Sequence, residues 1–313
     1  MTTAPTKTID EVDARIIAQL TLDPIMTNKA IASAMGIAET TVGTRIRGMG
    51  DRGVMRVVAL RDIRALGFDL IAHVYIRIEG RHPRAVAEEL AASPDLAMVA
   101  LAAGTPQVIV QVNARDREDL LARIERAMGN IAGIREIETS VVLRIVKFVS
   151  RYGVLLDQPE QTDERSGRDV EAHILALIAH DGRLGNREVG RRVGVSEAAV
   201  RKRIKALLDN GAVRFGVLVD PSALGLSSTA LIRLKVTPGM LSDVARQIAL
   251  REDISFVGLG VGAYDLMVVA AASDISQHCE FANRLVADNS GISHVEILEL
   301  QSILKIDVNV VKV

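Results

Sequence analysis

The sequence is poor in cysteine, with only Cys279 among its 313 residues. A single cysteine has no partner for a disulfide within the chain, and no group of cysteines and histidines shows the spacing of metal ligands. No apolar run is long enough to span a membrane, and residues 1–7 lack the apolar stretch of a signal peptide. We therefore expect a cytoplasmic protein that requires no metal, no cofactor and no membrane.

Charge of either sign is not in excess, because 38 basic and 39 acidic residues give a net charge of −1. A nucleic acid would have to be bound by a local basic patch, since the chain as a whole does not attract it. The residue patterns of common active sites are missing as well: paired carboxylates, Ser-His-Asp or Cys-His arrangements and a phosphate-binding loop. We expect no catalytic residues and no enzyme activity.

What the chain does contain is a long internal repeat. The segment Gly-Ile-Ala-Glu that begins at Gly36 matches Gly-Val-Ser-Glu at Gly194, and Arg45 matches Arg203 at the same offset of 158 residues. The offset is constant from about residue 11 to residue 155, which indicates two copies of one module. The name first copy is used below for residues 11–155, and second copy for the residues 158 positions later.

Residues 194–211 have the pattern of the turn and second helix of a helix-turn-helix. From Val200 onward, apolar residues fall at i, i+4, i+7 and i+8, which is one stripe of an α-helix, and the basic residues fall mostly elsewhere. Gly194 suits a tight turn, Ser196 can cap the helix and Gly211 can end it. The pattern predicts a helix with one buried face and one cationic face.

This helix has the composition of a DNA-recognition helix. Residues near the start of such a helix reach base edges in the major groove of double-stranded DNA, and longer cations also contact phosphates. We expect DNA contacts from Ser196, Ala198, Ala199, Arg201, Lys202, Arg203 and Lys205. For Arg203 the alternative is a structural ion pair with an acid on the first helix.

The corresponding helix of the first copy is predicted to be softer. It contains three glycines, each of which costs ~1 kcal/mol relative to alanine inside a helix. Ala38 stands where the second copy has Ser196, so the side-chain cap is lost. The residues of its DNA-facing surface are Thr40, Thr41, Thr44 and Arg45, where the hydroxyls could equally bond to the local backbone. If both helices contact DNA, the unequal surfaces predict an asymmetric site.

After each helix-turn-helix comes an extended segment, residues 54–60 and 212–219, that we expect to form a wing or hinge. The rest of the second copy has the order βαββαβ, which predicts a ferredoxin-like antiparallel sheet with both helices on one face. The fold class is α+β, with two copies of a winged helix-turn-helix followed by a ferredoxin-like domain. The predicted segments are helix-turn-helix domain 1 (1–62), sheet domain 1 (63–153), a polar linker (154–168), helix-turn-helix domain 2 (169–220) and sheet domain 2 (221–313).

This succession of elements resembles the Lrp/AsnC (feast/famine) family of transcription regulators. Residues 186–196 look like the family's DNA-binding segment, residues 220–225 look like its exit, and Gly262-Ala263-Tyr264-Asp265 matches its Gly-x-Tyr-Asp effector loop. The resemblance covers nearly the whole chain, counted twice. It implies RAM/AsnC-type sheet domains that dimerise, a homo-oligomer, paired recognition helices in successive major grooves, and sensing of an amino acid or a related small metabolite.

The resemblance places the effector at Gly262, Tyr264 and Asp265 of the second copy. The first copy has Gly-Thr-Pro-Gln at 104–107, without the tyrosine and the carboxylate, so we expect it not to bind the same ligand in the same way. The last strand keeps Thr139-Ser140 in the first copy, where the second copy has Ile297-Leu298. We therefore include Thr139 in the effector site, as part of a composite pocket made by the loop of the second copy and the strand of the first.

Two alternative functions stay open at this point. Siroheme decarboxylases use a similar fold, sometimes with two fused modules, although they would be expected to bring His and Arg into a large tetrapyrrole pocket. The other alternative is a metabolite-sensing assembly protein whose helix-turn-helices have lost their affinity for DNA, and the glycine-rich first copy is its best support.

Overall fold

A computed structural model describes residues 8–148, 170–251, 253–307 and 310–311. The predicted linker at 154–168 and the start of the chain at residues 1–7 lie outside the described residues. The described chain forms two compact units, one from residues 8–65, 170–224 and 310–311, and the other from residues 66–148 and 225–307. The first unit joins the two helix-turn-helix segments, and the second joins the two sheet segments.

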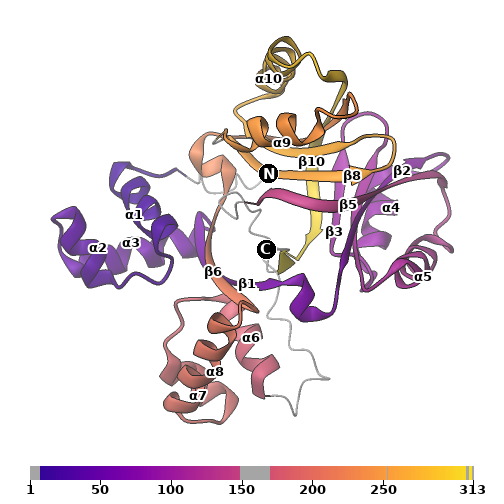
Figure 1. Cartoon of the computed structure of the whole chain (residues 1–313). Coiled ribbons are helices and arrows are strands. Elements are labelled where there is room, and N and C mark those ends of the chain that lie inside the picture. The colour runs from indigo at the N-terminus through magenta and orange to yellow at the C-terminus, as the bar shows by residue number, and fades with distance from the viewer. Residues whose placement is uncertain (1–7, 149–169, 252, 308–309, 312–313) are drawn as a thin grey trace. The chain divides into compact units, whose positions relative to one another are not determined.

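The first unit contains two groups of three helices (Figure 1). The first group, head 1, consists of α1 (Glu11–Leu22), α2 (Asn28–Met35) and α3 (Glu39–Asp51). The second group, head 2, consists of α6 (Val170–His180), α7 (Asn186–Val193) and α8 (Glu197–Asp209). In both heads a glycine in the left-handed conformation ends the middle helix, with φ 68° at Gly36 and φ 80° at Gly194, which confirms the predicted tight turns.

The extended segments that follow the heads pair with each other. Strand β1 (Met55–Asp62) runs antiparallel to β6 (Val213–Val219), with Val58 opposite Gly216. The short β11 (Val310–Val311) lies parallel to β1 on its other side. The expectation of a wing or hinge in each copy is thus realised as one shared ribbon, because each strand takes the strand of the other copy as its hydrogen-bonding partner.

This pairing also exchanges apolar side chains between the heads. Val217 and Val219 of β6 are buried in the core of α1, α2 and α3, whereas Ala59 of β1 is buried in the core of α6, α7 and α8. Two 3-10 turns, η1 (Ile63–Leu66) and η3 (Pro221–Leu224), follow the strands. Each head therefore closes its core with a strand from the other copy.

The second unit has the element order βαββαβ twice (Figure 1). Its first half is β2 (Leu70–Ile78), α4 (Pro83–Ala91), β3 (Met98–Ala102), β4 (Val108–Ala114), α5 (Arg117–Met128) and β5 (Ile134–Phe148). Its second half is β7 (Ser228–Val236), α9 (Leu241–Ala249), β8 (Ile254–Val261), β9 (Leu266–Ala272), α10 (Ile275–Asp288) and β10 (Ile292–Ile306). All neighbouring strands are antiparallel.

The two four-stranded sheets close into one barrel with the order β10-β3-β4-β2-β5-β8-β9-β7. Closure follows from the length of β5 and β10, which have 15 residues each. The first part of β5 pairs with β2 in its own half and the last part pairs with β8 in the other half, and β10 does the same with β7 and β3. The sequence predicts one sheet in each copy. The length of β5 and β10 does not show from the sequence which strand of the other half pairs with their ends.

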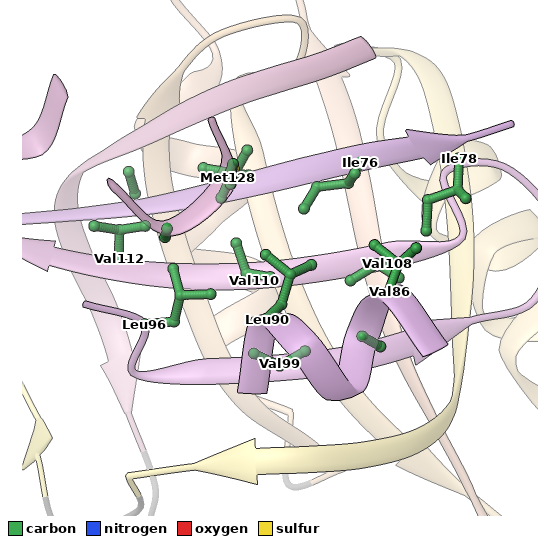
Figure 2. Packing of buried hydrophobic residues seen from close by; sticks show 14 of the residues in the cluster. Ile76, Ile78, Val86, Leu90, Leu96, Val99, Val108, Val110, Val112 and Met128 are labelled. Carbon is green, nitrogen blue, oxygen red and sulfur yellow. The ribbon is translucent and has the colours of Figure 1, made fainter. Parts of the chain in front are cut away.

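Each half packs its helices on the outer face of its own sheet. In the first half, Val86 and Leu90 of α4 and Met128 of α5 belong to one buried apolar cluster with Val99 and Val110 of the strands (Figure 2). A corresponding cluster fills the space between α9, α10 and the second sheet. Since side chains alternate along a strand, the residues between these apolar positions face the inside of the closed sheet.

Candidate DNA-binding and effector sites

Helix α8 has the local structure that the sequence predicts. The Ser196 hydroxyl accepts a hydrogen bond from the Ala199 N–H at 3.2 Å, which confirms the N-terminal cap. Val200 and Leu207 are buried in the head 2 core, and Gly211 has φ 73° just beyond the helix end. One stripe of α8 therefore holds the helix in place, and the opposite surface is left for other contacts.

The cations of α8 lie on that opposite surface. Arg201, Lys202 and Lys205 are exposed, and Arg203 is half-buried. Arg201 lies 3.9 Å from Glu197, and Lys205 lies 2.7 Å from Asp209, both at the i, i+4 spacing. Ser196 and Ala198 are exposed and Ala199 is half-buried at the start of the helix. Exposed ion pairs such as those of Arg201 and Lys205 contribute little to stability, so these two side chains can leave their partners to contact phosphates.

The turn of head 2 depends on a close approach at Gly190 of α7. A Cβ atom at this position would lie 2.5 Å from the Val195 carbonyl oxygen. On the same helix, Glu188 accepts hydrogen bonds from Arg191 and Arg192, and these two hydrogen bonds, chiefly that of Arg191, lower the pKa of Glu188 to about 2. Two more cations are thus held beside the turn that leads into α8.

Helix α3 of head 1 is held differently. Ala38 at its start makes no side-chain cap, as predicted, and Thr40, Thr41 and Thr44 are exposed. The sequence names Arg45 as a DNA contact, but the structure turns it toward α1, where Nη1 contacts Asp10 and lies 3.3 Å from Asp13 Oδ1. Hydrogen bonding to Asp10 raises the pKa of Arg45.

Asp13 is the reason that Arg45 is held there. Its side chain is 2% exposed, and Arg52 donates to its other oxygen at 3.2 Å. A buried carboxylate requires such partners. The structural ion pair considered as the alternative for Arg203 is thus observed at the corresponding Arg45, and DNA contact by Arg45 stays a prediction.

In the second unit, the predicted effector loop lies directly against β5 of the first copy. A Cβ atom at Gly262, which has φ 154°, would lie 2.5 Å from Ser140 Oγ and 3.1 Å from the Thr139 carbonyl oxygen. The loop of the second copy and the last strand of the first copy are therefore in contact, as the composite pocket requires. Thr139 makes this contact through its backbone carbonyl group.

The side chain of Thr139 lies on the other face of β5. Thr139 is opposite Val74, which belongs to the apolar cluster under the helices, whereas Ser140 is opposite His73. Neighbouring residues of a strand point to opposite faces, so Ser140 shares the loop's side. Within the described residues, the fully buried Ser140 Oγ has no hydrogen-bond partner. The sequence points to the pair Thr139-Ser140 and predicts Thr139 in the site, whereas the structure has the Ser140 side chain on the side of the loop.

Asp265 has a structural role at the end of β7. Its Oδ2 accepts a hydrogen bond from the Val236 N–H at 2.9 Å, at the end of β7. Gln107, the corresponding residue of the first copy, accepts from the Ile78 N–H at 3.0 Å through Oε1. The carboxylate and the amide thus hold equivalent strand ends, and only the carboxylate adds a negative charge.

The centre of the candidate effector site is a buried arginine that sequence reasoning missed. Arg233 of β7 is 2% exposed, and its guanidinium lies 4.0 Å from the ring centre of Tyr75 and 4.3 Å from that of Tyr264. Nη1 donates to Glu138 Oε1 at 2.6 Å, and Nε donates to Glu296 Oε2 at 2.5 Å. The name Arg233 cluster is used below for these five side chains.

The repeat explains this cluster. At the offset of 158, Tyr75 corresponds to Arg233 and Glu138 corresponds to Glu296, so one carboxylate comes from the last strand of each copy. Burial disfavours the charged form of Arg233, but its neighbours outweigh that effect and the pKa of Arg233 is raised. Burial raises the pKa of Tyr264, and burial also raises the pKa of Tyr75. The position of Arg233 within an otherwise largely apolar strand is the sequence signal that could have identified it.

The cluster has one cation and two carboxylates, and it continues to the surface. Tyr264 is half-buried, and its ring lies 5.8 Å from that of the exposed His294. The side chains of Glu138 and Glu296 are 39% and 27% exposed. The site thus offers oxygen acceptors and an aromatic face beside a guanidinium that already has its partners.

The described residues contain no group of three or more His, Cys, Asp or Glu side chains that could hold a metal ion. Among the same residues, no helix combines the length and the apolar character that crossing a membrane requires.

Comparisons with known proteins bear on the family of the chain. The model of the AsnC-type helix-turn-helix domain matches residues 9–49 and 169–208, and the model of the Lrp/AsnC ligand binding domain matches residues 71–151. An HTH-type transcriptional regulator of Pyrococcus furiosus is 30% identical over 138 residues, which are 44% of this chain and 93% of that protein. The HTH-type transcriptional regulator FL11 of Pyrococcus abyssi is 34% identical over 101 residues, which are 32% of this chain and 67% of that protein.

Among solved structures, the siroheme decarboxylase NirDL resembles the chain with a TM-score of 0.66 and 16% sequence identity, over 95% of this chain and 93% of that one. At this identity the likeness shows the fold. The matched domains and the fold define a helix-turn-helix protein that also has a domain of the Lrp/AsnC ligand-binding type. The chain belongs to the Lrp/AsnC family of transcription regulators.

Proposed function

We propose that this regulator binds double-stranded DNA at specific sequences through α8 and, more weakly, through α3, and that an amino acid or a related small metabolite changes this binding. The observation that carries the DNA part is the exposed cationic surface of α8 on a capped helix whose opposite stripe is buried. Arg201, Lys202 and Lys205 supply phosphate contacts, and Ser196, Ala198 and Ala199 face the groove. Arg203, Thr40, Thr41, Thr44 and Arg45 complete the proposed surface.

The effector part rests on the chemistry around Tyr264. An amino acid needs acceptors for its ammonium group, and carboxylates are strong acceptors for a charged donor. Glu138, Glu296 and Asp265 provide carboxylates near the loop, and Arg233 neutralises one of them. The backbone of Gly262 and Thr139 brings the two copies together at the same place. These features favour a composite site for a small molecule that carries an ammonium group.

The repeat supports a further part of the proposal, that the chain is a fusion of two family modules. One chain then supplies the paired heads and the paired sheets that a dimer of single modules would supply, and the predicted five segments describe the order of the fusion. We further propose that chains associate into a homo-oligomer, that the protein has no catalytic role, and that it acts in the cytoplasm.

Binding to the DNA upstream of its own gene tests the proposal. We expect the full chain to shift this duplex at low salt, with an affinity that falls steeply as salt rises. At least one of the twenty amino acids should change the affinity or the size of the complex. Binding that is equal for an unrelated duplex of the same length would contradict sequence-specific recognition, and an identical response to all amino acids would contradict the effector.

A second candidate function is kept because the fold of nearly the whole chain resembles that of the siroheme decarboxylase NirDL. Arg233 and His294 both lie next to Tyr264, so the site does contain the residue types expected for a tetrapyrrole carboxylate. Anaerobic addition of siroheme separates the two functions. A change in siroheme absorbance on binding, with loss of carboxylate from the substrate, would favour the enzyme, and unchanged absorbance would favour the regulator.

A further inference from the structure

One side chain of head 2 is bound into head 1. Arg183 lies in the loop between α6 and α7, and its guanidinium reaches the loop between α1 and α2 of head 1. Nη1 donates to the Met26 carbonyl oxygen at 2.8 Å and to the Pro24 carbonyl oxygen at 3.3 Å, and Nη2 donates to Asn28 Oδ1 at 2.8 Å. Three acceptors of one head are therefore held by a single arginine of the other.

The loop that carries Arg183 is itself fixed. The Gly182 N–H donates to the Val57 carbonyl oxygen of β1 at 2.8 Å, and the Arg183 N–H donates to Asp181 Oδ1 at 2.9 Å. A Cβ atom at Gly182 would lie 2.9 Å from the ring of Phe215, so this position needs glycine. Arg183 is half-buried at this contact, and burial lowers its pKa. The backbone at Gly182 and Arg183 is therefore held by two hydrogen bonds, and the guanidinium of Arg183 ends in a partly buried site.

The contact exists in one direction only. The residue of the first copy that corresponds to Arg183 is Ile25, whose side chain has no hydrogen-bond donor and is 54% exposed. Head 2 thus contacts head 1 through Arg183, and head 1 has no equivalent side-chain donor at Ile25. In a symmetric pair of modules the two positions would carry the same residue.

The contact continues to the recognition helix of head 1. Asn28 is the first residue of α2, and its Nδ2 lies 3.3 Å from the place that a Cβ of Gly43 would occupy on α3. Gly43 is buried, whereas the corresponding residue of α8 is the exposed Arg201. The side chain of Asn28 thus accepts from Arg183 through Oδ1 and has its Nδ2 next to Gly43 of α3.

We propose that Arg183 is a positioning residue that sets α3 relative to α8, so that the two heads read one composite DNA site at one fixed spacing. This inference rests on the proposed DNA binding and adds the residue that fixes its geometry. The bidentate and planar guanidinium suits this role, because it donates to several acceptors in fixed directions.

The first experiment needs no DNA. Amide hydrogen exchange of residues 23–30 is measured in the full chain and in the variants Arg183→Ala, Arg183→Lys and Arg15→Ala. Arg15 is an exposed arginine of head 1 that donates to the Met35 carbonyl oxygen within the same head, so it serves as the control. We expect exchange to rise about 10-fold or more in Arg183→Ala, less in Arg183→Lys, and not at all in the control. Equal exchange in all four proteins would contradict the coupling.

The second experiment uses duplexes that the unaltered chain selects from a randomised library. Insertion of 5 base pairs at the centre of a selected duplex turns one half-site by about half a helical turn. We expect the insertion to weaken binding by the unaltered chain and by Arg15→Ala about 10-fold or more, and binding by Arg183→Ala by less than about 3-fold. An equal loss in Arg183→Ala would overturn the inference. A chain that selects no duplex would overturn the proposed function, and the exchange experiment would still show whether Arg183 couples the heads.

Discussion

The two helix-turn-helix heads have the same three helices and the same left-handed glycine at the turn, but they hold their recognition helices by different means. In head 2 the helix is capped by Ser196, and Arg201, Lys202 and Lys205 are exposed. In head 1 the cap is absent, and Arg45 is drawn to the buried Asp13. Head 2 thus presents basic residues of its recognition helix to solvent. Head 1 instead pairs a basic residue of its recognition helix with a buried carboxylate of its own core.

The two halves of the closed sheet differ in a similar way. His73 and Ser140 face the inside of the first half, where the second half has Leu231 and Leu298 at the corresponding positions. His73 is 7% exposed, and its Nδ1 lies 3.3 Å from Met267 Sδ. At these two positions the first half has polar side chains and the second half has apolar ones, whereas the second half contributes the buried Arg233. The copies have diverged in complementary directions.

The largest effect that we predict concerns the turn of head 2. Gly190→Ala would place a methyl group 2.5 Å from the Val195 carbonyl oxygen, and the backbone must move to receive it. We expect a loss of about 3 kcal/mol in the free energy of unfolding. The reverse change at the corresponding position, Ala32→Gly in head 1, should cost only about 1 kcal/mol, because it lacks the clash. Urea unfolding of both variants measures the difference, and equal losses would show that the two turns are packed alike.

The next effect concerns DNA. Arg201→Ala with Lys202→Ala removes two exposed cations of α8, and we expect DNA affinity to fall about 50-fold and the salt dependence to become shallower. The matched variant of head 1 is Thr44→Ala with Arg47→Ala, since both side chains are exposed on α3. Its expected loss is about 5-fold or less. Titration of both variants with the upstream duplex measures the two losses. Equal losses would contradict the ranking of the two heads.

The local parts of this structure could be predicted from the sequence because their signals are local. The stripe of α8, its cap at Ser196 and the turns at Gly36 and Gly194 depend on residues a few positions apart, and all are observed. The predicted order βαββαβ of the second copy is also observed.

The parts that were not predicted depend on residues far apart in the sequence. Arg233 meets Glu138 across 95 residues, and β1 meets β6 across the two copies. Side-chain alternation on β5, which separates Thr139 from Ser140, requires the register with β2. A sequence pattern gives the period of a strand, but the partner strand decides which of its two faces becomes the site.

The inside of the sheet offers a test by pH. Burial lowers the pKa of His73 to about 4 from an ordinary value of 6.5, so the folded protein keeps this imidazole neutral while the unfolded chain takes up a proton below pH 6.5. Stability from this group is therefore lost as the pH falls from about 6.5 to 4, by about 2 kcal/mol between pH 7 and pH 5. His73→Leu, which copies Leu231 of the second half, should remove this part of the pH dependence. Unfolding at both pH values measures it, and the exposed His294→Leu serves as the control.

The smallest predicted effect exchanges the caps of the two recognition helices. Ala38→Ser supplies the missing acceptor at the start of α3, and we expect it to stabilise head 1 by about 1 kcal/mol. Ser196→Ala removes the hydrogen bond to the Ala199 N–H and should destabilise head 2 by a similar amount. Hydrogen exchange of α3 and α8 in each variant assigns the effect to a head. Ala38→Ser could slow the exchange of α3 without raising the DNA affinity of the protein. The weaker DNA binding proposed for head 1 would then follow from the surface residues of α3 and not from the stability of this helix.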